Sequence, residues 1–300
     1  LSRQHMNLRQ LLELVVLAAL WGASFLFMRI GAPEMGPVGL IVIRTLVAGL
    51  FLLPFLFFYN SHRGVRRHLP AIALVGVIGS AMPFALIAYA TLTVTAGYAS
   101  ILNATTPMFG ALVAWIWLGD RLRPSGIIGL LVGFAGVFVL VWGKGEMPSL
   151  QLGTAVAAAL TATLLYALAA TTTKRYLAEV HPLTLATLSQ LFAAASLLPL
   201  ALLAVPEQMP SAKAWWSVVL LGIASTGIAY VIYFRLISQV GPTKTLTVTF
   251  LIPAFGLFWG WLFLEEAIGW SMVAGCLLIL LGVGLTTGVL AGRSRRLKQG

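Results

Sequence analysis

Charged residues are scarce in this sequence. Only 9% of its 300 residues are Asp, Glu, Lys or Arg, 60% are hydrophobic, and the mean hydropathy is +0.97. A soluble domain carries about 25% charged residues, so a chain with this little charge could not cover a water-facing surface. The shortage excludes an ordinary soluble protein and predicts a surface that faces lipid.

Cysteine, histidine and acidic side chains are also few. The single cysteine, Cys276, lies in an apolar run, which excludes an intrachain disulfide and a thiolate metal cluster. All four histidines fall in expected loops or at the N-terminus, and the acidic residues lie at span ends or in loops apart from Glu13. The sequence contains no GxSxG, HExxH or P-loop motif. We therefore expect no enzyme activity, no metal and no cofactor.

Long apolar runs take up most of the chain. A bilayer span needs about 20 mostly apolar residues, and a strand facing lipid would alternate with polar residues. The fold class is therefore all-α, a polytopic membrane protein. Its ten expected helices are Leu11–Gly31, Val38–Phe58, Ala71–Thr91, Thr95–Leu118, Pro124–Trp142, Gly153–Thr173, Leu183–Val205, Trp215–Leu236, Thr243–Leu264 and Gly269–Leu290.

The net charge of +11 is concentrated in the short loops on one side of these spans. Cytoplasmic loops carry the excess of Lys and Arg, so both termini are expected in the cytoplasm, and nucleic acid is not an expected partner. The other side holds only Lys144 and Lys213. The cytoplasmic set is Arg3, Arg9, Arg63, Arg66, Arg67, Arg121, Arg123, Lys174, Arg175, Arg235, Lys244, Arg293, Arg295, Arg296 and Lys298.

The two halves of the chain resemble each other, which predicts repeats at 1–147 and 148–300. A shift of 145 or 146 residues superimposes like residues in corresponding spans. An odd number of helices per repeat inverts the second copy, and inverted repeats are typical of secondary transporters. The matched pairs include Gly76 with Gly222, Pro107 with Pro253, Trp115 with Trp261, Glu34 with Glu179, Pro37 with Pro182 and Arg29 with Lys174.

Glycines form a stripe on the fifth expected helix, and part of it recurs on the tenth. Such stripes let membrane helices approach closely, so we interpret them as packing positions with no role in binding. The residues are Gly126, Gly129, Gly133 and Gly136, and then Gly275 and Gly282.

Pro107 and Pro253 are repeat mates near the middle of their spans. A proline removes the hydrogen bond to the carbonyl four residues earlier, which here belongs to Asn103 and Thr249. Paired broken helices indicate a transporter binding site, so these two polar residues are candidate contacts and the prolines candidate hinges. The alternative, that both prolines only bend helices around a core, stays open.

Aromatic residues provide a second set of candidate lining residues. Rings around a cavity would stack on an apolar or aromatic solute, or hold a cation over a ring face. Interfacial anchoring or simple core packing is the alternative for each of them. The candidates are Trp21 and Phe25 with Ser24 on the first span, Tyr98 on the fourth, Tyr166 on the sixth, and Tyr230 and Tyr233 on the eighth.

Arg44 is the one ionisable residue well inside a span, roughly 10 Å from the outer end of the second helix. It either attracts a substrate carboxylate, or it snorkels outward or caps carbonyls at the outer end of the first helix. The second interpretation is the commoner one for such a residue. Its repeat mate is Ser189, so its role is expected to be asymmetric.

Several stretches resemble the drug/metabolite transporter superfamily, EamA type, over essentially the whole chain. They read ALWGASFLFMRIG, IVIRTLVAGLFLLP, PMFGALVAWIWLGDRLRPSGIIGLLVGFAGVFVLV and its repeat PAFGLFWGWLFLEEAIGWSMVAGCLLILLGVGL. Arg44 matches the family's arginine in the second helix. Asp120 stands where the family usually has Glu, and Glu265 or Glu266 fills that place in the second half.

The resemblance implies a central cavity between helices 1, 3, 4, 6, 8 and 9, and export of small metabolites that are often amino acids. The aromatic content suits the YddG-type branch of aromatic amino-acid exporters. We therefore expect an alternating-access exporter in the bacterial inner membrane, with the lipid bilayer and a small-molecule substrate as partners.

Alternatives remain at this point. A quaternary-cation or multidrug efflux carrier is the second hypothesis, although a cavity acid that would favour it is absent. A nucleotide-sugar carrier would need more buried cations than Arg44, and a scaffold would lack a polar cavity. Transport is expected to be facilitated, unless protons couple through Glu13 or the substrate itself. The oligomeric state is open, a monomer included.

Overall fold

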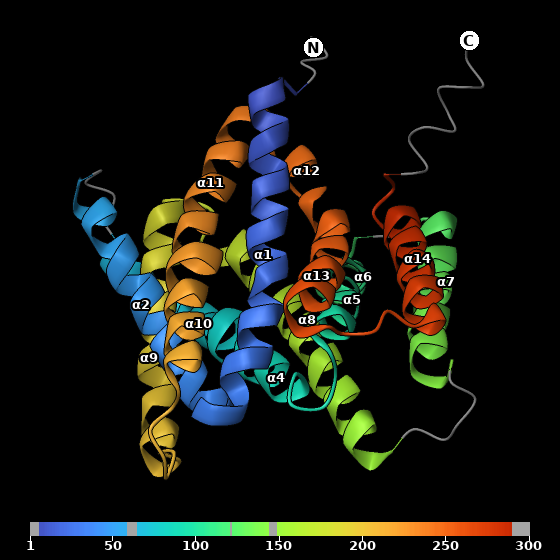
Figure 1. Cartoon of the computed structure of the whole chain (residues 1–300). Coiled ribbons are helices and arrows are strands. Elements are labelled where there is room, and N and C mark those ends of the chain that lie inside the picture. The colour runs from blue at the N-terminus through green and yellow to red at the C-terminus, as the bar shows by residue number, and fades with distance from the viewer. Residues whose placement is uncertain (1–5, 59–64, 121, 144–148, 290–300) are drawn as a thin grey trace.

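A computed structural model describes residues 6–58, 65–120, 122–143 and 149–289 of the chain (Figure 1). Within these ranges the protein is helical and contains no strand, as expected for an all-α membrane protein. Several residues of the charge and span predictions lie outside the described residues: Arg3, Arg63, Arg121, Lys144, Leu290, Arg293, Arg295, Arg296 and Lys298.

The helices follow one another through short connections. The first half contains α1 (Leu8–Met35), α2 (Pro37–Phe58), η1 (Val65–His68), α3 (Leu69–Gly76), η2 (Val77–Ala81), α4 (Met82–Ala90), α5 (Ala96–Asn103), α6 (Thr106–Val113), η3 (Ala114–Leu118) and α7 (Pro124–Trp142). The second half contains α8 (Leu150–Tyr176), α9 (Pro182–Leu203), α10 (Ala212–Gly222), η4 (Ile223–Ile228), α11 (Ala229–Val240), α12 (Pro242–Thr245), α13 (Val248–Leu264) and α14 (Trp270–Thr286).

These elements confirm the ten predicted spans. In the described part of the chain, eight helical stretches are long and apolar enough to cross a membrane, and the shorter α13 and α14 complete the set. Helix starts follow ordinary capping chemistry, in which a Ser or Thr oxygen accepts a hydrogen bond from the first turn. Thr95, Ser149 and Ser211 do this for α5, α8 and α10.

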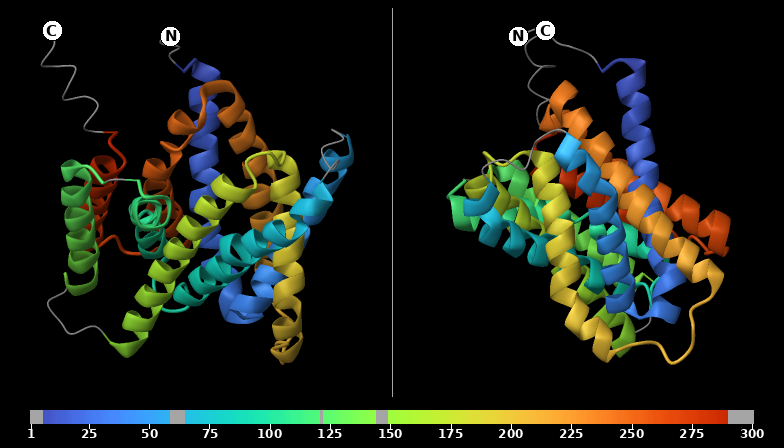
Figure 2. Two further views of the ribbon diagram at one scale, coloured as in Figure 1. Left: turned by 180° about the vertical axis from the view of Figure 1, so that it is seen from behind. Right: turned by 90° about the vertical axis from the view of Figure 1, so that its left-hand side faces the viewer.

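The chain enters and leaves the bundle on the same side, where α1 begins and α14 ends (Figures 1 and 2). We call this side the terminal face, and the opposite side, where α1 ends and α8 begins, the far face. Because the spans alternate in direction, α1 and α8 run oppositely, as two inverted five-helix units require. Eight of the predicted cytoplasmic cations are described, and all are on helix ends or loops of the terminal face: Arg9, Arg66, Arg67, Arg123, Lys174, Arg175, Arg235 and Lys244.

Helices α7 and α14 pair at one edge of the bundle, and α2 and α9 pair at the other (Figure 1). The predicted glycine stripe is the α7–α14 seam. A Cβ added at Gly282 would lie 2.6 Å from backbone atoms of Gly129 and Gly133, and one added at Gly136 would lie 2.9 Å from the carbonyl of Gly275. The glycines therefore act in packing, as the stripe predicts.

The third and eighth spans each contain a π-helical segment, η2 and η4, at positions related by the repeat. Such segments are rare, and they are frequently found at functional sites because they shift the helix register and loosen its backbone bonding. Both segments face the middle of the bundle, where they carry Gly79, Ser80, Ser225 and Thr226. The fold therefore places two irregular, polar segments at its centre.

The outside of the bundle is apolar. Large hydrophobic side chains are exposed along its length, which is what a bilayer-facing surface requires. They include Leu50, Trp115, Ile116, Leu131, Phe138, Leu203, Trp261 and Phe263.

Candidate functional site

A cavity of about 690 Å³ occupies the middle of the bundle. Its walls come from α1, α8, α11 and α13, from η4, and from the break between α5 and α6. Its size falls within the range of small-molecule binding sites.

Arg44 of α2 forms the end of the cavity nearer the far face. Its side chain is only 4% exposed, and its Nε donates a 3.1 Å hydrogen bond to the Oγ1 of Thr226. Its Nη1 lies 3.8 Å from the sulfur of Met28, and its guanidinium carbon lies 3.6 Å from the ring centre of Phe84. The interpretation that Arg44 snorkels outward is wrong, because these neighbours hold the guanidinium inside the bundle.

No described carboxylate is paired with Arg44, since the ion pairs in the described ranges involve only other cations. A guanidinium has five N–H donors, and the two contacts above leave several of them without a protein acceptor. An unneutralised cation at this depth favours an anionic group of a ligand.

The repeat mate of Arg44 also needs correction. The Nε2 of Gln190 donates a 2.9 Å hydrogen bond to the Oγ of Ser80. Ser80 and Thr226 are equivalent positions in η2 and η4, so Gln190 occupies the place of Arg44 in the other half. The aligned residue Ser189 instead bonds to its own helix. The architecture is therefore symmetric at this point, and only the charge is asymmetric.

The fourth span breaks at the predicted place. α5 ends at Asn103, α6 begins at Thr106, and Pro107 stands in its first turn. The freed carbonyl of Asn103 is not left unpaired, because the hydroxyl of Thr106 donates a 2.7 Å hydrogen bond to it. The unpaired atom is instead the side-chain oxygen Oδ1 of Asn103, which is buried without a hydrogen-bond partner in the described part of the chain.

The ninth span breaks one turn earlier than its mate. The interruption lies between α12 and α13, and Pro253 lies inside α13, buried and away from the cavity lining. Thr249 does line the cavity, and its hydroxyl donates a 2.8 Å hydrogen bond to the carbonyl of Leu246. The hydroxyl oxygen retains its capacity to accept a hydrogen bond.

Aromatic rings form the cavity walls. The ring centres of Trp21 and Tyr233 lie 5.2 Å apart, and those of Phe84 and Tyr166 lie 6.1 Å apart. Tyr230 lines the same space and stacks on Phe234 at 5.8 Å. Ser24 and Phe25 also face the cavity.

Tyr98 is the predicted lining residue that the structure places elsewhere. Its hydroxyl donates a 3.3 Å hydrogen bond to the carbonyl of Leu140 in α7, outside the cavity. Tyr98 therefore packs between helices and does not line the cavity, because α5 turns the side that carries Tyr98 toward α7.

The cavity opens toward the terminal face. Lys174 and Leu177 at the end of α8 line it, as do Ile237 of α11 and Leu246. Among the described residues, the lining residue nearest a helix end at the far face is Ile87, in the last turn of α4. The described lining therefore gives a solute a route to Arg44 from the terminal face.

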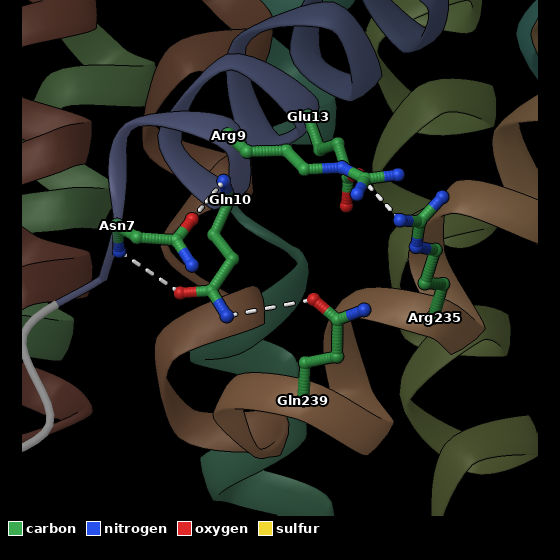
Figure 3. Close-up of polar contacts among 6 residues, drawn as sticks. All are labelled: Asn7, Arg9, Gln10, Glu13, Arg235 and Gln239. Atoms are coloured by element: carbon green, nitrogen blue, oxygen red, sulfur yellow. Dashed lines mark hydrogen bonds and ion pairs between the residues drawn. The ribbon is translucent and has the colours of Figure 1, made fainter.

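A polar cluster ties the start of α1 to the end of α11 at the terminal face (Figure 3). Glu13 accepts from Arg9 at 3.2 Å and pairs with Arg235 at 3.3 Å, and Gln10 donates to Gln239 at 3.4 Å. Glu13 does not line the cavity. Its carboxylate bridges two arginines, which gives it a structural role between these two helices.

Sequence reasoning missed Ser225 and Lys174. The hydroxyl of Ser225 is buried and unpaired within the described residues, and it lines the cavity. Its signal was the polar pair Ser225–Thr226 in an apolar span, at the position of Gly79–Ser80 in the other half. No group of His, Cys, Asp and Glu that could hold a metal occurs in the described ranges.

The chain matches the model of the EamA-like transporter family at residues 10–142 and again at residues 153–288. Together these two matches cover most of the sequence, and each falls within one of the two predicted repeats.

Similar proteins are transporters. The uncharacterized transporter YoaV of Bacillus subtilis is 23% identical over 92% of this chain and 96% of its own length. A probable terminal-alkyne amino-acid exporter of Streptantibioticus cattleyicolor is 28% identical over 94% of both chains. A solved crystal structure with 21% sequence identity matches 94% of this chain and 97% of its own with a TM-score of 0.68, which shows a common fold.

Proposed function

The chain belongs to the EamA-like transporter family, and we propose that it exports amino acids, aromatic ones included, across the bacterial inner membrane by alternating access. The terminal face is cytoplasmic in this proposal, because Lys and Arg gather there and cytoplasmic loops carry such an excess. The cavity then opens on the side from which an exporter loads its substrate.

The observation that carries the proposal is the pairing of two unsatisfied groups in one cavity. Arg44 offers guanidinium donors that no described carboxylate neutralises, and Asn103 offers a buried oxygen without a donor. A zwitterionic amino acid would satisfy both at once, with its carboxylate on Arg44 and its ammonium on Asn103. Buried polar groups are normally paired, so a ligand that completes these two is favoured.

The hydroxyl of Ser225 adds a third polar contact, and that of Thr249 a fourth. The aromatic walls would take the substrate side chain, through the tilted pair Trp21 and Tyr233 and the edge-on pair Phe84 and Tyr166. Such rings hold flat apolar groups by stacking. The similarity to a probable amino-acid exporter supports the same substrate class.

A quaternary-cation efflux carrier is the second candidate, because aromatic walls also attract cations. Arg44 opposes it, since a like charge at the cavity floor repels a cation and no described Asp or Glu lines the cavity to compensate. For the same reason we propose facilitated transport, with no cavity carboxylate to carry a coupled proton.

The test is counterflow in liposomes that contain the purified protein, with radiolabelled tryptophan, threonine and methyl viologen as the panel. We expect amino-acid uptake, with tryptophan the better substrate. Arg44→Gln should raise the KM at least about tenfold, because a charge-assisted hydrogen bond contributes roughly 1.5–3 kcal/mol. Trp21→Ala and Asn103→Ala should also weaken uptake.

The matched control is Gln190→Leu, which alters the repeat-related contact outside the cavity. It should affect stability more than the KM. If methyl viologen alone is taken up, the protein is a cation efflux carrier and the amino-acid proposal is wrong. If Arg44→Gln leaves the KM unchanged, Arg44 does not bind the substrate carboxylate.

A further inference from the structure

In a protein built from inverted repeats, the contacts at one face predict which contacts the other face can make. Each residue of one repeat has an equivalent residue in the second repeat, on the opposite face, although the two do not always make the same contact. A contact present on both faces belongs to a unit that stays packed when either face opens. A contact present on one face only marks a surface that separates and closes during transport.

Two pairs of contacts are present on both faces. Arg44 with Thr226 has its equivalent in Gln190 with Ser80. The carboxylate of Glu34 accepts hydrogen bonds from Ser211 at the start of α10, and its mate Glu179 pairs with Arg67 at the start of the third span. These contacts hold the parts of the fold that do not open.

Arg29 makes a contact whose equivalent is absent. It lies near the end of α1, and its Nη1 donates to the carbonyl of Thr91 at the C-terminal end of α4. A cation at this end of a helix meets the negative end of the helix dipole and unpaired carbonyls. The contact closes α1 onto α4 at the far face.

The equivalent residues at the terminal face are Lys174 of α8 and Ile237 in the last turns of α11. Both line the cavity, and they come from two different helices. The ammonium of Lys174 makes no hydrogen bond or ion pair with any described residue, and the side chain is exposed. Lys174 thus supplies a cation equivalent to Arg29, but it does not contact the end of α11, the helix end equivalent to that of α4.

The helix packing shows the same difference. Gly256 of α13 is in contact with Ser100 of α5 at the far face. Its mate Gly110 in α6 has open space where a Cβ would stand. Two independent repeat-related positions therefore agree that the far face is closed and the terminal face is open.

We propose that Lys174 is the gate residue of the terminal face. The carbonyl of Ile237 already accepts from the N–H of Gly241, but the carbonyl of Ser238 has Pro242, which lacks an N–H, at its helical donor position. When the terminal face closes, the ammonium of Lys174 binds these last-turn carbonyls just after Ile237, as Arg29 binds Thr91 now, and the Arg29 contact separates. Lys174 and Arg29 then alternate, one bound and one released in each half of the cycle. The inference relies on the protein being a transporter, and not on which substrate it carries.

The first test measures gate opening directly. Gly110→Cys in a Cys276→Ala background places the only cysteine in the open space next to α6, in the half of the bundle nearer the terminal face. Its labelling by a membrane-impermeant maleimide from the terminal side reports how much of the protein is open there. Lys174→Gln should raise this labelling and slow substrate exchange about tenfold, the factor expected when one contact between a cation and a helix end is lost.

Arg175→Gln is the matched control. Arg175 is the next residue, has the same charge, lies over the ring of Tyr176 and does not line the cavity. It should leave labelling and exchange unchanged, and Lys174→Arg should restore both. Equal effects of Lys174→Gln and Arg175→Gln would overturn the proposal, because they would reflect surface charge alone.

Cross-linking gives an independent result. A Lys174→Cys and Ile237→Cys pair joined by a short bifunctional thiosulfonate should stop exchange and protect the cavity from the terminal side. An Arg29→Cys and Thr91→Cys pair should also stop exchange but leave the cavity open. A Lys174–Ile237 cross-link that leaves the cavity accessible would overturn the gate. Labelling needs no substrate, so a failure of amino-acid counterflow would count against the proposed substrate alone.

Discussion

The fourth span of each repeat ends in the same backbone motif. Gly119 and Glu265 both adopt left-handed conformations, with φ of 72° and 54°. The N–H of the next residue, Asp120 or Glu266, returns to the carbonyl six residues earlier, at 3.3 Å and 3.1 Å. The N–H of the left-handed residue donates to the same carbonyl, so both bonds are wider by one residue or more than those of a Schellman C-cap. The two helix ends are therefore equivalent in structure although they lie on opposite faces.

Their acidic side chains have different partners. Glu266 accepts hydrogen bonds from the N–H groups of Ala96 at 2.9 Å and Gly97 at 3.4 Å, at the start of α5. Asp120 is exposed and accepts no hydrogen bond within the described ranges. The open terminal face accounts for part of this difference. The sequence accounts for another part, because the repeat mate of Ala96 is Pro242, which has no N–H to donate, and Asp120 is one methylene shorter than Glu266.

The largest expected effect comes from filling the two equivalent glycine positions. Gly110→Leu fits the open space of this conformation, so we expect normal folding. It should reduce exchange to about a tenth or less, because closing the terminal face would then require an overpacked contact costing roughly 1–3 kcal/mol. The measurement is exchange in liposomes, with thermal unfolding in detergent as the check on folding.

Gly256→Leu is the reciprocal variant. Ser100 already occupies the space beside Gly256, so this substitution should hold the far face apart and reduce labelling from the terminal side. The two variants should thus stop transport in opposite conformations. The same labelling pattern in both would show that the faces do not alternate.

A smaller effect is expected from the two acids. Glu266→Gln weakens the cap on α5, which should lower the free energy of unfolding by about 1 kcal/mol. Asp120→Asn should change it by less than about 0.5 kcal/mol, since the side chain has no described hydrogen bond to lose. Chemical unfolding in mixed micelles measures both, and equal losses would contradict the assignment of an open terminal face.

Hydropathy and charge were sufficient to predict the membrane fold. Each apolar run of about 20 residues forms a helical span, because backbone N–H and C=O groups in lipid can form hydrogen bonds only with each other. The glycine stripe also predicted the α7–α14 seam, since glycines at helical spacing have few other uses in a membrane.

The polar partners inside the bundle could not be predicted in the same way. Gln190 takes the place of Arg44 although alignment selects Ser189, because a shift of one residue in register turns a different side chain toward η2. The carbonyl of Asn103 is taken by Thr106, a local bond that proline spacing does not reveal. The π-helical segments, which depend on tertiary packing, left no signal in hydropathy.

An effect of the same size as that of Glu266→Gln tests the equivalence of the two helix ends. A left-handed conformation costs a residue with a Cβ roughly 1 kcal/mol more than glycine. Gly119→Ala should therefore destabilise the protein by about 1 kcal/mol, and Glu265→Gly should stabilise it by up to a similar amount, offset by the greater chain entropy of glycine when unfolded. Unfolding in mixed micelles should give shifts of opposite sign for the two variants. Glu265 is exposed, so a loss of stability in Glu265→Gly would mean that its side chain, and not the backbone motif, holds this end of α13.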